Sequence, residues 1–575
     1  MRTANVLPRL MMAALAAFAT VKAGAQERSN ARSMVITQRG IVATSQTLAS
    51  QAGAQVLARG GSAADAAIAA NAVLGLVEPM MSGIGGDLFA LYWDAKTGKL
   101  TGLNSSGGAP KALSIEFLKQ HGYSSMPSSG IHTVTVPGCV RGWAAMHHRF
   151  GRLPWAELFA PAIYYASHGF PVTEMIQAEW ANAYSKLSGD DNARRVFLPN
   201  GSAPDVGQVF RNPELARAYR LLAGMGPDAF YKGPIAHAIL ATSQRLGGTL
   251  TAADLAQYEP EWVQPISTTY RGWKVYELPP NGQGIGTLEM LNLLEPFPLG
   301  DYPQLSAEAL HWEIEAQKLS FQDIRKYVGD PRFVKVPVEG LLSKDYARER
   351  AAEIDPEKAN CGTQPGRPGE VHNTTYLAAI DRDGNIASWI ESNSEVFGSG
   401  VVVDGMGFPL HDRGSGFSLD PNAANALAPG KRPYHTIIPA FMEKGTVHTG
   451  FGIMRGMNQA QAQAQFVSNV ADHGMNIQAA LEAPRFTKMT LGGCDVVVEG
   501  RVPADVREAL EKKGHRLTVV GDYSYQVGGG QAVSHDSSTN VNYGASSPRK
   551  DGEAIPEPDP YFTKAPAIPI NHPRR

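Results

Sequence analysis

The sequence predicts an α+β protein in which a helix-rich part precedes a strand-rich part. Amphipathic helical runs fill much of residues 140–350, and short β-rich segments separated by Gly and Asn follow from about Thr374. With 43% hydrophobic residues among 575, the chain can bury a large core. Its 52 Lys and Arg nearly balance 54 Asp and Glu, which excludes a protein built around a basic nucleic-acid-binding surface.

The N-terminus is expected to be an export signal. Arg2 and Arg9 supply positive charge, residues 10–21 are apolar but too few to span a bilayer, and Ala23-Gly24-Ala25 offers a cleavage site. An uncleaved anchor is the alternative. We expect residues 1–25 to be removed and the mature protein to be periplasmic or secreted, with no membrane partner after cleavage.

Two alanine-rich helices are predicted near the start of the mature chain. The first covers residues 47–58, Gly60 and Gly61 break it, and Ser62 caps the second over 63–76. Alanines on every face of the second helix place it in the interior. The glycine loop 82–87 then leads into a strand and not a helix, so it is not expected to bind nucleotide phosphates.

The remaining elements follow from hydrophobic periodicity and from end signals. We expect helices over 213–223, 307–326 and 458–473, and strands over 133–136, 273–277, 375–380, 386–390, 401–403, 447–450 and 517–520. Residues 360–373 are expected to be exposed and flexible, and residues 552–575 to form a proline-rich surface tail. Three widely spaced cysteines predict neither a disulfide framework nor a zinc site.

A hairpin is predicted to gather hydroxyl groups near Thr374. Asp383-Gly384 is typical of a two-residue turn, and this register sets Thr374 opposite residue 393. Thr374, Ser392 and Ser394 then lie together at the open end of the hairpin. The simpler interpretation is that Thr374 is only a β-favouring strand residue.

Thr374 is a candidate nucleophile because of its position in the chain. A threonine hydroxyl is a poor nucleophile unless a base removes its proton, and a free N-terminal amine on the same residue is one such base. A backbone cut between Asn373 and Thr374 gives Thr374 both groups. Ser392 is the candidate that orients them by hydrogen bonding.

The sequence resembles the γ-glutamyltranspeptidase family, whose members are N-terminal nucleophile hydrolases. The resemblance covers about residues 35–552. It is carried by Ala49-Ser50-Gln51-Ala52-Gly53, Gly60-Gly61-Ser62-Ala63-Ala64-Asp65, Glu78-Pro79, Gly83-Ile84-Gly85-Gly86, Thr374-Thr375-Tyr376, Phe397-Gly398-Ser399-Gly400, Pro429-Gly430-Lys431-Arg432-Pro433 and Pro548-Arg549-Lys550-Asp551-Gly552.

The resemblance implies a four-layer αββα sandwich formed by two intertwined subunits of one precursor. A cut before Thr374 gives a large subunit (26–373) and a small subunit (374–575). The implied reaction takes a small-molecule γ-glutamyl amide through an acyl-threonine intermediate to water or an amine. Backbone N–H groups of Arg455 and Gly456 form the implied oxyanion hole, and no metal or organic cofactor takes part.

Four departures from the family pattern concern substrate recognition. No arginine stands at Gly107-Gly108, where the family holds a carboxylate, and Gly416 replaces an aspartate. A Ser-Ser pair becomes His435-Thr436, and a Gly-Gly pair becomes Arg455-Gly456. The candidate substrate-binding residues are therefore Ser394, Arg413, His435 and Thr436, with Arg413 or Arg455 as a relocated anion clamp.

Three functions remain open at this point. The first is a hydrolase or transferase of γ-glutamyl amides of the glutathione type. The second is an acylase for glutaryl or cephalosporin-like amides, because the short segment between Phe417 and Lys431 resembles the lidless, cephalosporin-acylase-like branch. The third is a processed but inactive binding protein. We also expect Gly108→Arg with Gly416→Asp to improve γ-glutamyl turnover.

Overall fold

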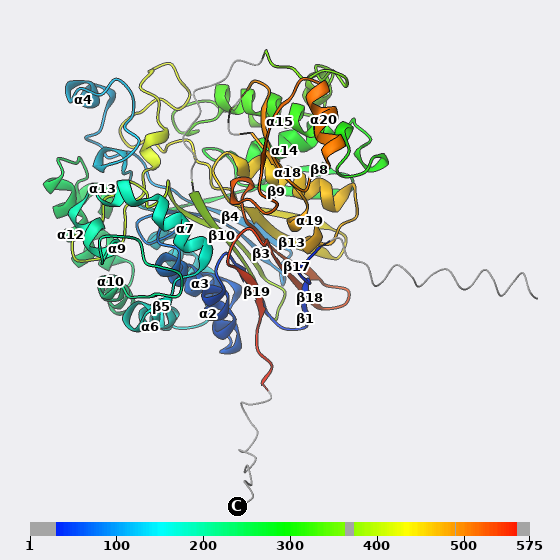
Figure 1. Cartoon of the computed structure of the whole chain (residues 1–575). Helices are drawn as coiled ribbons and strands as arrows, with labels where there is room; N and C mark the ends of the chain where they lie inside the picture. Colours follow the sequence, from blue (N-terminus) through cyan, green and yellow to red (C-terminus); the bar gives the residue numbers. More distant parts are fainter. Residues whose placement is uncertain (1–29, 363–372, 489, 491, 561–575) are drawn as a thin grey trace, which may run out of the picture.

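Two facing β-sheets with helices on both outer sides form the protein. The structure is a computed structural model that describes residues 30–362, 373–488, 490 and 492–560. The expected signal peptide and most of the segment expected to be flexible lie outside the described residues. Figure 1 shows α2, α3, α6 and α10 on one side of the strands and α14, α15 and α18 on the other. The predicted four-layer αββα sandwich is confirmed.

Each sheet has seven strands. The first has the order β1 (Val35–Thr37), β18 (Val541–Ser546), β17 (Gly530–Asp536), β13 (Val447–Ile453), β12 (Ala440–Lys444), β9 (Trp273–Glu277) and β8 (Ile266–Tyr270). The second has the order β19 (Glu553–Pro556), β2 (Ile41–Thr44), β10 (Asn373–Ile380), β11 (Ile386–Ser394), β3 (Asp87–Asp94), β4 (Lys99–Ser105) and β7 (Glu261–Val263). Both sheets thus combine strands from before and after residue 373.

The helices fall into two groups, which build two apolar clusters outside the sheets. Over the second sheet lie helices that include α2 (Thr47–Ala58), α3 (Ala63–Val77), α5 (Cys139–Phe150), α6 (Ala160–His168), α7 (Glu174–Asn182), α9 (Asp191–Phe197), α10 (Pro213–Met225), α11 (Asp228–Tyr231) and α12 (Pro234–Arg245). Over the first lie α14 (Gly284–Leu294), α15 (Ala307–Tyr327), α16 (Val338–Leu341), α17 (Lys344–Ala351), α18 (Asn458–Ala471) and α19 (Ile477–Glu482).

Smaller elements complete the fold. They are α4 (Ile115–Gln120), α8 (Tyr184–Leu187), α13 (Ala252–Ala256), α20 (Ala504–Lys512), the pair β5 (Phe170–Pro171) and β6 (Val209–Phe210), and the sheet of β14 (Phe486–Thr487), β15 (Asp495–Glu499) and β16 (Arg516–Val520).

A third apolar cluster fills the space between the two sheets. Phe89, Tyr376 and Ile390 of the second sheet meet Phe441 and Val533 of the first, and all five are fully buried. Inward-facing side chains alternate along these strands, as expected when a sheet packs face to face with another. The centre of the second sheet, where β10 lies, is therefore covered on both faces.

The alanine-rich helices form as predicted. Ser62 caps α3 through a capping box with Asp65, and every residue of α3 is buried. Small side chains allow this helix to lie close to β10 and β11. The predicted strands over 273–277, 375–380, 386–390, 447–450 and 517–520 also form, with extended ends at several of them.

Several local predictions are wrong. Residues 131–133 form a 3₁₀ turn and the predicted strand over 133–136 is irregular, while residues 401–403 contribute only an isolated bridge from Val402 to Pro409. The helix from Pro213 continues to Met225 and ends at Gly226 instead of Gly224. The proline-rich tail begins with β19, which pairs with β2, so this part is not a free surface segment.

The hairpin turn is one residue longer than predicted. Asp381 N–H donates to the carbonyl of Asn385 at 3.1 Å, which leaves three connecting residues, 382–384. Gly384 takes a left-handed conformation with φ +80°, as the last residue of three-residue hairpin loops often does. The register therefore moves by one, and Thr375 pairs with Glu391.

One disulfide is present, which the cysteine spacing did not predict. It joins Cys361 to Cys494, 133 residues apart in the sequence, whereas Cys139 is a buried free thiol. Cys361 is the last residue but one of the described range 30–362, and Cys494 directly precedes β15.

Candidate active site

Thr374 lies in an irregularity at the start of β10. Asn373 pairs with Ser394 and Thr375 pairs with Glu391, so the register shifts between them and Thr374 faces Ser392 and its neighbour. Thr374 is 1% exposed. The bulged strand is β11, because two of its residues, Ser392 and Asn393, face Thr374 alone.

Ser392 and Ser394 lie at the end of β11, opposite the start of β10. The Ser392 hydroxyl accepts a hydrogen bond from the Ser394 N–H at 2.7 Å, and both residues are fully buried. Ser394 has φ +79°, a conformation that is uncommon for a non-glycine residue. Asn393 N–H donates to the Met81 carbonyl at 2.9 Å, so the end of β11 is fixed against the glycine loop.

Gln459 contacts the Thr374 hydroxyl, and the sequence analysis missed it. Its Nε2 donates to Thr374 Oγ1 at 3.2 Å, while its Oε1 accepts from Ile438 N–H at 3.2 Å. The second bond fixes which end of the amide faces Thr374. With one lone pair of Oγ1 engaged by a donor, the Thr374 hydroxyl retains its own proton for a base.

Arg455 and Gly456 form the turn between β13 and α18. Their φ values are +88° and +48°, and a left-handed non-glycine residue such as Arg455 is strained. Gln283 Nε2 donates to the Gly456 carbonyl at 2.8 Å. The Arg455 guanidinium carbon lies 4.4 Å from the ring centroid of Tyr525, and burial lowers its pKa. Its Nε has no hydrogen-bond partner among the described residues.

One pocket holds both Thr374 and Arg455. Its remaining walls are Met81, Glu179, Met454, Tyr525, Gly528, Gly529 and Lys550. Lys550 Nζ lies 2.8 Å from Glu179 Oε2 and 3.7 Å from Glu78 Oε1. Burial alone lowers the pKa of Lys550, but these two carboxylates more than offset burial, so the net shift is upward. The pocket therefore presents two cations and one carboxylate beside a buried hydroxyl.

Glu78 connects this pocket to β10. Its Oε2 accepts from the Thr375 hydroxyl at 2.8 Å and from the Ser45 hydroxyl at 2.6 Å. Glu78 and Lys550 both lie in motifs that carry the family resemblance, so the sequence could have indicated them as site residues. Glu179 lies in α7 and has no such signal.

Arg413, His435 and Thr436 form a neighbouring buried cluster. Arg413 Nη1 donates to Thr436 Oγ1 at 2.8 Å, and its Nε and Nη2 have no partner among the described residues. Burial lowers the pKa of Arg413 to about 10. His435 Nε2 lies 3.2 Å from Asp87 Oδ2, and burial raises the pKa of Asp87 to about 7.

Gln283 links this cluster to the turn. Its Nε2 donates to the Thr436 carbonyl at 2.6 Å and to the Gly456 carbonyl at 2.8 Å. Thr374 and Arg455 line one pocket, Gln459 bonds Thr374, and Gly456 follows Arg455 in the turn. Ser392 and Ser394 lie opposite the start of β10. Arg413, His435 and Thr436 adjoin it through Gln283 and do not line the pocket at Thr374.

The glycines at 107 and 108 are required by their surroundings. A Cβ at Gly107 would lie 1.8 Å from the Val136 carbonyl oxygen, and one at Gly108 would lie 2.4 Å from the Gly430 carbonyl oxygen. An arginine at 108 would therefore force the backbone to move, which argues against the expected gain in turnover. At Gly416 the nearest atom is 3.9 Å away, so Gly416→Asp has room.

Two histidines and a glutamate form a further cluster of potential metal ligands. Donor atoms of His311, Glu315 and His515 lie within 4.8 Å of one another, but Lys318 Nζ lies 2.6 Å from Glu315 Oε1 and the two imidazoles bond each other at 2.8 Å. Burial and nearby lysines lower the pKa of His515 to about 3. We assign no metal to this charge-balanced cluster.

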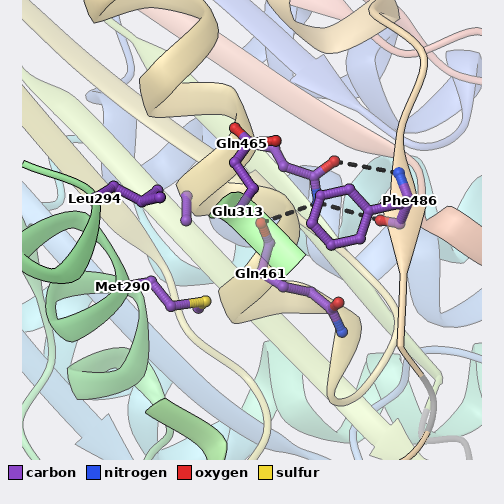
Figure 2. Close-up of a pocket in the computed structure, with 7 residues that line it drawn as sticks. Met290, Leu294, Glu313, Gln461, Gln465 and Phe486 are labelled. Atoms are coloured by element: carbon purple, nitrogen blue, oxygen red, sulfur yellow. Dashed lines mark hydrogen bonds between the residues drawn. The ribbon is translucent and has the colours of Figure 1, made fainter. Parts of the chain in front are cut away.

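A second small cavity lies between α14, α15 and α18. Figure 2 shows Met290, Leu294, Glu313, Gln461, Gln465 and Phe486 around it. Gln465 Nε2 donates to the Phe486 carbonyl at 3.1 Å, and Phe486 N–H donates back to Gln465 Oε1 at 3.3 Å. These bonds hold α18 against β14, which is a structural role.

Comparisons with known proteins identify one family. The profile of the family described as Gamma-glutamyltranspeptidase matches residues 49–557. The structure of cephalosporin acylase from Bacillus halodurans is similar, with a TM-score of 0.86, 44% identity, and coverage of 93% of this chain and 99% of that one. The glutathione hydrolase-like YwrD proenzyme of Bacillus subtilis (strain 168) is 37% identical over 526 residues, covering 91% of this chain and 99% of the relative.

An acylase proenzyme is also similar to this chain. The acylase ACY 1 proenzyme of Pseudomonas sp. (strain SE83) is 34% identical over 527 residues, covering 90% of this chain and 93% of the relative. Within the described residues, none of the helices combines the length and apolar character that a membrane crossing requires.

Proposed function

The chain belongs to the gamma-glutamyltranspeptidase family of N-terminal nucleophile hydrolases, and we propose that it hydrolyses amides of dicarboxylate acyl groups, γ-glutamyl amides included, through an acyl-Thr374 intermediate. One observation carries this proposal. The buried Thr374 hydroxyl, fixed by Gln459, opens onto a pocket that presents Arg455 and Lys550. Lys550 is already paired with Glu179 and Glu78, whereas Arg455 Nε has no hydrogen-bond partner among the described residues, so Arg455 favours an acyl group that ends in a carboxylate.

The proenzyme is proposed to cut its own backbone. Thr374 Oγ attacks the carbonyl carbon of Asn373, the peptide bond becomes an ester, and water hydrolyses the ester. The products are a carboxylate on Asn373 and a free amine on Thr374, in a large subunit (26–373) and a small subunit (374–575). The hydrogen bond from Gln459 Nε2 to Thr374 Oγ1 supports this step, because it holds the hydroxyl that must attack the adjacent carbonyl.

The freed amine then acts as the base for amide hydrolysis. It takes the hydroxyl proton as Thr374 Oγ attacks the substrate carbonyl, and the backbone N–H groups of Arg455 and Gly456 are proposed to stabilise the oxyanion. Gln459 and Ser392 hold the hydroxyl and the end of β11 in place. Water or an amine accepts the acyl group. No step passes through a metal or an organic cofactor.

Recognition of the acyl group is proposed to rest on Arg455. Its Nε lacks a partner among the described residues and it lines the pocket, whereas Arg413 lies outside the lining. An acylase for glutaryl amides is the second candidate. It is favoured because Glu179, the carboxylate in the pocket, already pairs with Lys550 and is less available to a substrate ammonium group.

Export is proposed for the mature protein. Residues 1–25 have the charge, length and cleavage site of a signal peptide, which supports a periplasmic or secreted location. N-terminal sequencing of the large subunit tests this proposal, and a start near Gln26 is expected.

The test compares three p-nitroanilides, γ-glutamyl, glutaryl and butyryl, with Thr374→Ala as the blank. We expect both dicarboxylate substrates to be cleaved faster than the butyryl substrate, and glutathione to be a weak substrate because Gly107, Gly108 and Gly416 supply no charge. Equal rates for all three would contradict the proposed cation recognition. A processed protein that cleaves none of them would support the inactive binding protein instead.

A further inference from the structure

The disulfide crosses the proposed processing site. Cys361 stands twelve residues before Asn373, and Cys494 stands well after Thr374. A cut between Asn373 and Thr374 therefore assigns the two cysteines to different subunits. The bond within one chain of the precursor becomes a bond between two chains of the mature protein.

Contacts on both sides of the disulfide hold the end of the large subunit on the small subunit. Ala359 N–H donates to the Lys513 carbonyl at 2.7 Å, and Lys513 Nζ donates to the Pro356 carbonyl at 2.7 Å. Cys494 is 1% exposed, and its carbonyl accepts from Arg516 N–H at 2.7 Å. The residues around both sulfur atoms are thus fixed independently of the bond.

Large-subunit side chains complete this docking. Lys318 Nζ donates to the Asn360 carbonyl at 3.2 Å, and Asn360 N–H donates to Glu315 Oε2 at 3.3 Å. His311 of α15 bonds both the Asp355 carbonyl and His515, each at 2.8 Å. Residues 355–362 therefore lie between α15 of the large subunit and the sheet of β15 and β16 of the small subunit.

We infer that the Cys361–Cys494 disulfide is an intersubunit bond that keeps the large and small subunits covalently joined after processing. The inference rests on the proposed cut before Thr374. To form the bond, each thiol gives up a proton and an electron, and the two electrons pass to a disulfide-bearing oxidant, as export to an oxidising compartment allows. Cys139 is buried in α5 and remains a thiol.

The consequence is a mature protein whose subunits remain together when noncovalent contacts are lost. Denaturant or dilution alone then does not separate the subunits, whereas reduction together with denaturation separates them. The bond also determines how processing must be assayed, because a denaturing gel without a reductant shows one band even when cleavage is complete.

The test is denaturing electrophoresis of the purified protein, with thiols blocked by N-ethylmaleimide, run with and without dithiothreitol. From 61.6 kDa over 575 residues, 348 residues (26–373) and 202 residues (374–575) correspond to about 37 and about 22 kDa. We expect one band near their combined mass without reductant and two bands with it. Two bands under both conditions would overturn the tether while leaving self-cleavage intact.

A single band near the combined mass under both conditions would overturn self-cleavage, and the intersubunit bond with it, so the two failures look different. Cys361→Ser and Cys494→Ser should each give two bands without reductant. Cys139→Ser is the matched control and should behave as the unmodified protein does. Cys361 is exposed, so Cys361→Ser is the milder variant. A covalent band that persists in it would refute the assignment.

Discussion

Replacing Arg455 with alanine removes the guanidinium from the pocket and leaves the backbone N–H in place. Both residues carry a Cβ, so the left-handed backbone at φ +88° is equally strained before and after the change. If Arg455 holds a substrate carboxylate, the loss is one charge-assisted interaction of about 1.5–3 kcal/mol. This corresponds to a fall of about 10- to 150-fold in kcat/KM for γ-glutamyl and glutaryl p-nitroanilides.

The butyryl substrate has no terminal carboxylate, so it distinguishes a loss of carboxylate recognition from a loss of catalysis. Its turnover should not change in Arg455→Ala, and self-cleavage should proceed, because neither uses the guanidinium. Arg501→Ala is the matched control, since Arg501 also stacks on a tyrosine, with its guanidinium carbon 3.9 Å from the Tyr523 ring centroid, but does not line the pocket. Equal losses for charged and uncharged substrates would refute the clamp.

Three further predictions follow from the site. Thr374→Ala should run as one uncut chain on a reducing gel and should have no amidase activity. Thr374→Ser should be cut slowly, because serine lacks the methyl group that restricts its rotamer, and Ser392→Ala should be cut yet lose about tenfold or more in turnover. N-terminal sequencing that finds a first residue other than Thr374 in the small subunit would assign the nucleophile to another residue. Burial raises the pKa of Glu391 from 4.5 to about 8, so the folded state retains a proton that the unfolded chain releases, and stability should fall as the pH rises through this window. Thermal unfolding between pH 5 and 8 should be less pH-dependent in Glu391→Gln, and an unchanged slope would contradict the shift. Gly416→Asp should raise the ratio of γ-glutamyl to glutaryl turnover, whereas Gly108→Arg should lower the yield of folded protein. A well-folded Gly108→Arg protein would show that the backbone at Gly430 can move to accommodate the side chain.

The sequence predicted correctly the elements that are set by neighbouring residues in the chain. Ser62 caps α3 because its hydroxyl and Asp65 act within one turn, and the start of β10 near Thr374 followed from strand propensity. The proline content of the tail concealed β19, which forms because β2 offers it an edge. The hairpin register was wrong by one because Asp383-Gly384 fits both two- and three-residue loops.

The residues that line the pocket together could not be predicted from the sequence. Lys550 and Glu179 are 371 residues apart, and neither periodicity nor spacing relates them. Gln459 stands next to the predicted oxyanion turn, but its role depends on Ile438 fixing the amide. Arg413 and Arg455 were equivalent candidates in the sequence. Only the geometry distinguishes them, because Arg455 alone of the two lines the pocket with Thr374.

The position of β10 has a consequence for how the mature protein comes to exist. This strand begins at the proposed cut, yet it lies between β2 and β11 in the interior of a sheet. Two separately synthesised subunits would have to find these interleaved pairings without the connection that lowers the entropy of bringing them together. The precursor then serves as its own folding template, and cleavage removes that template. Once the proposed cut is made and the Cys361–Cys494 bond is reduced, the mature protein is maintained by the height of its unfolding barrier and not by a reversible balance with free subunits.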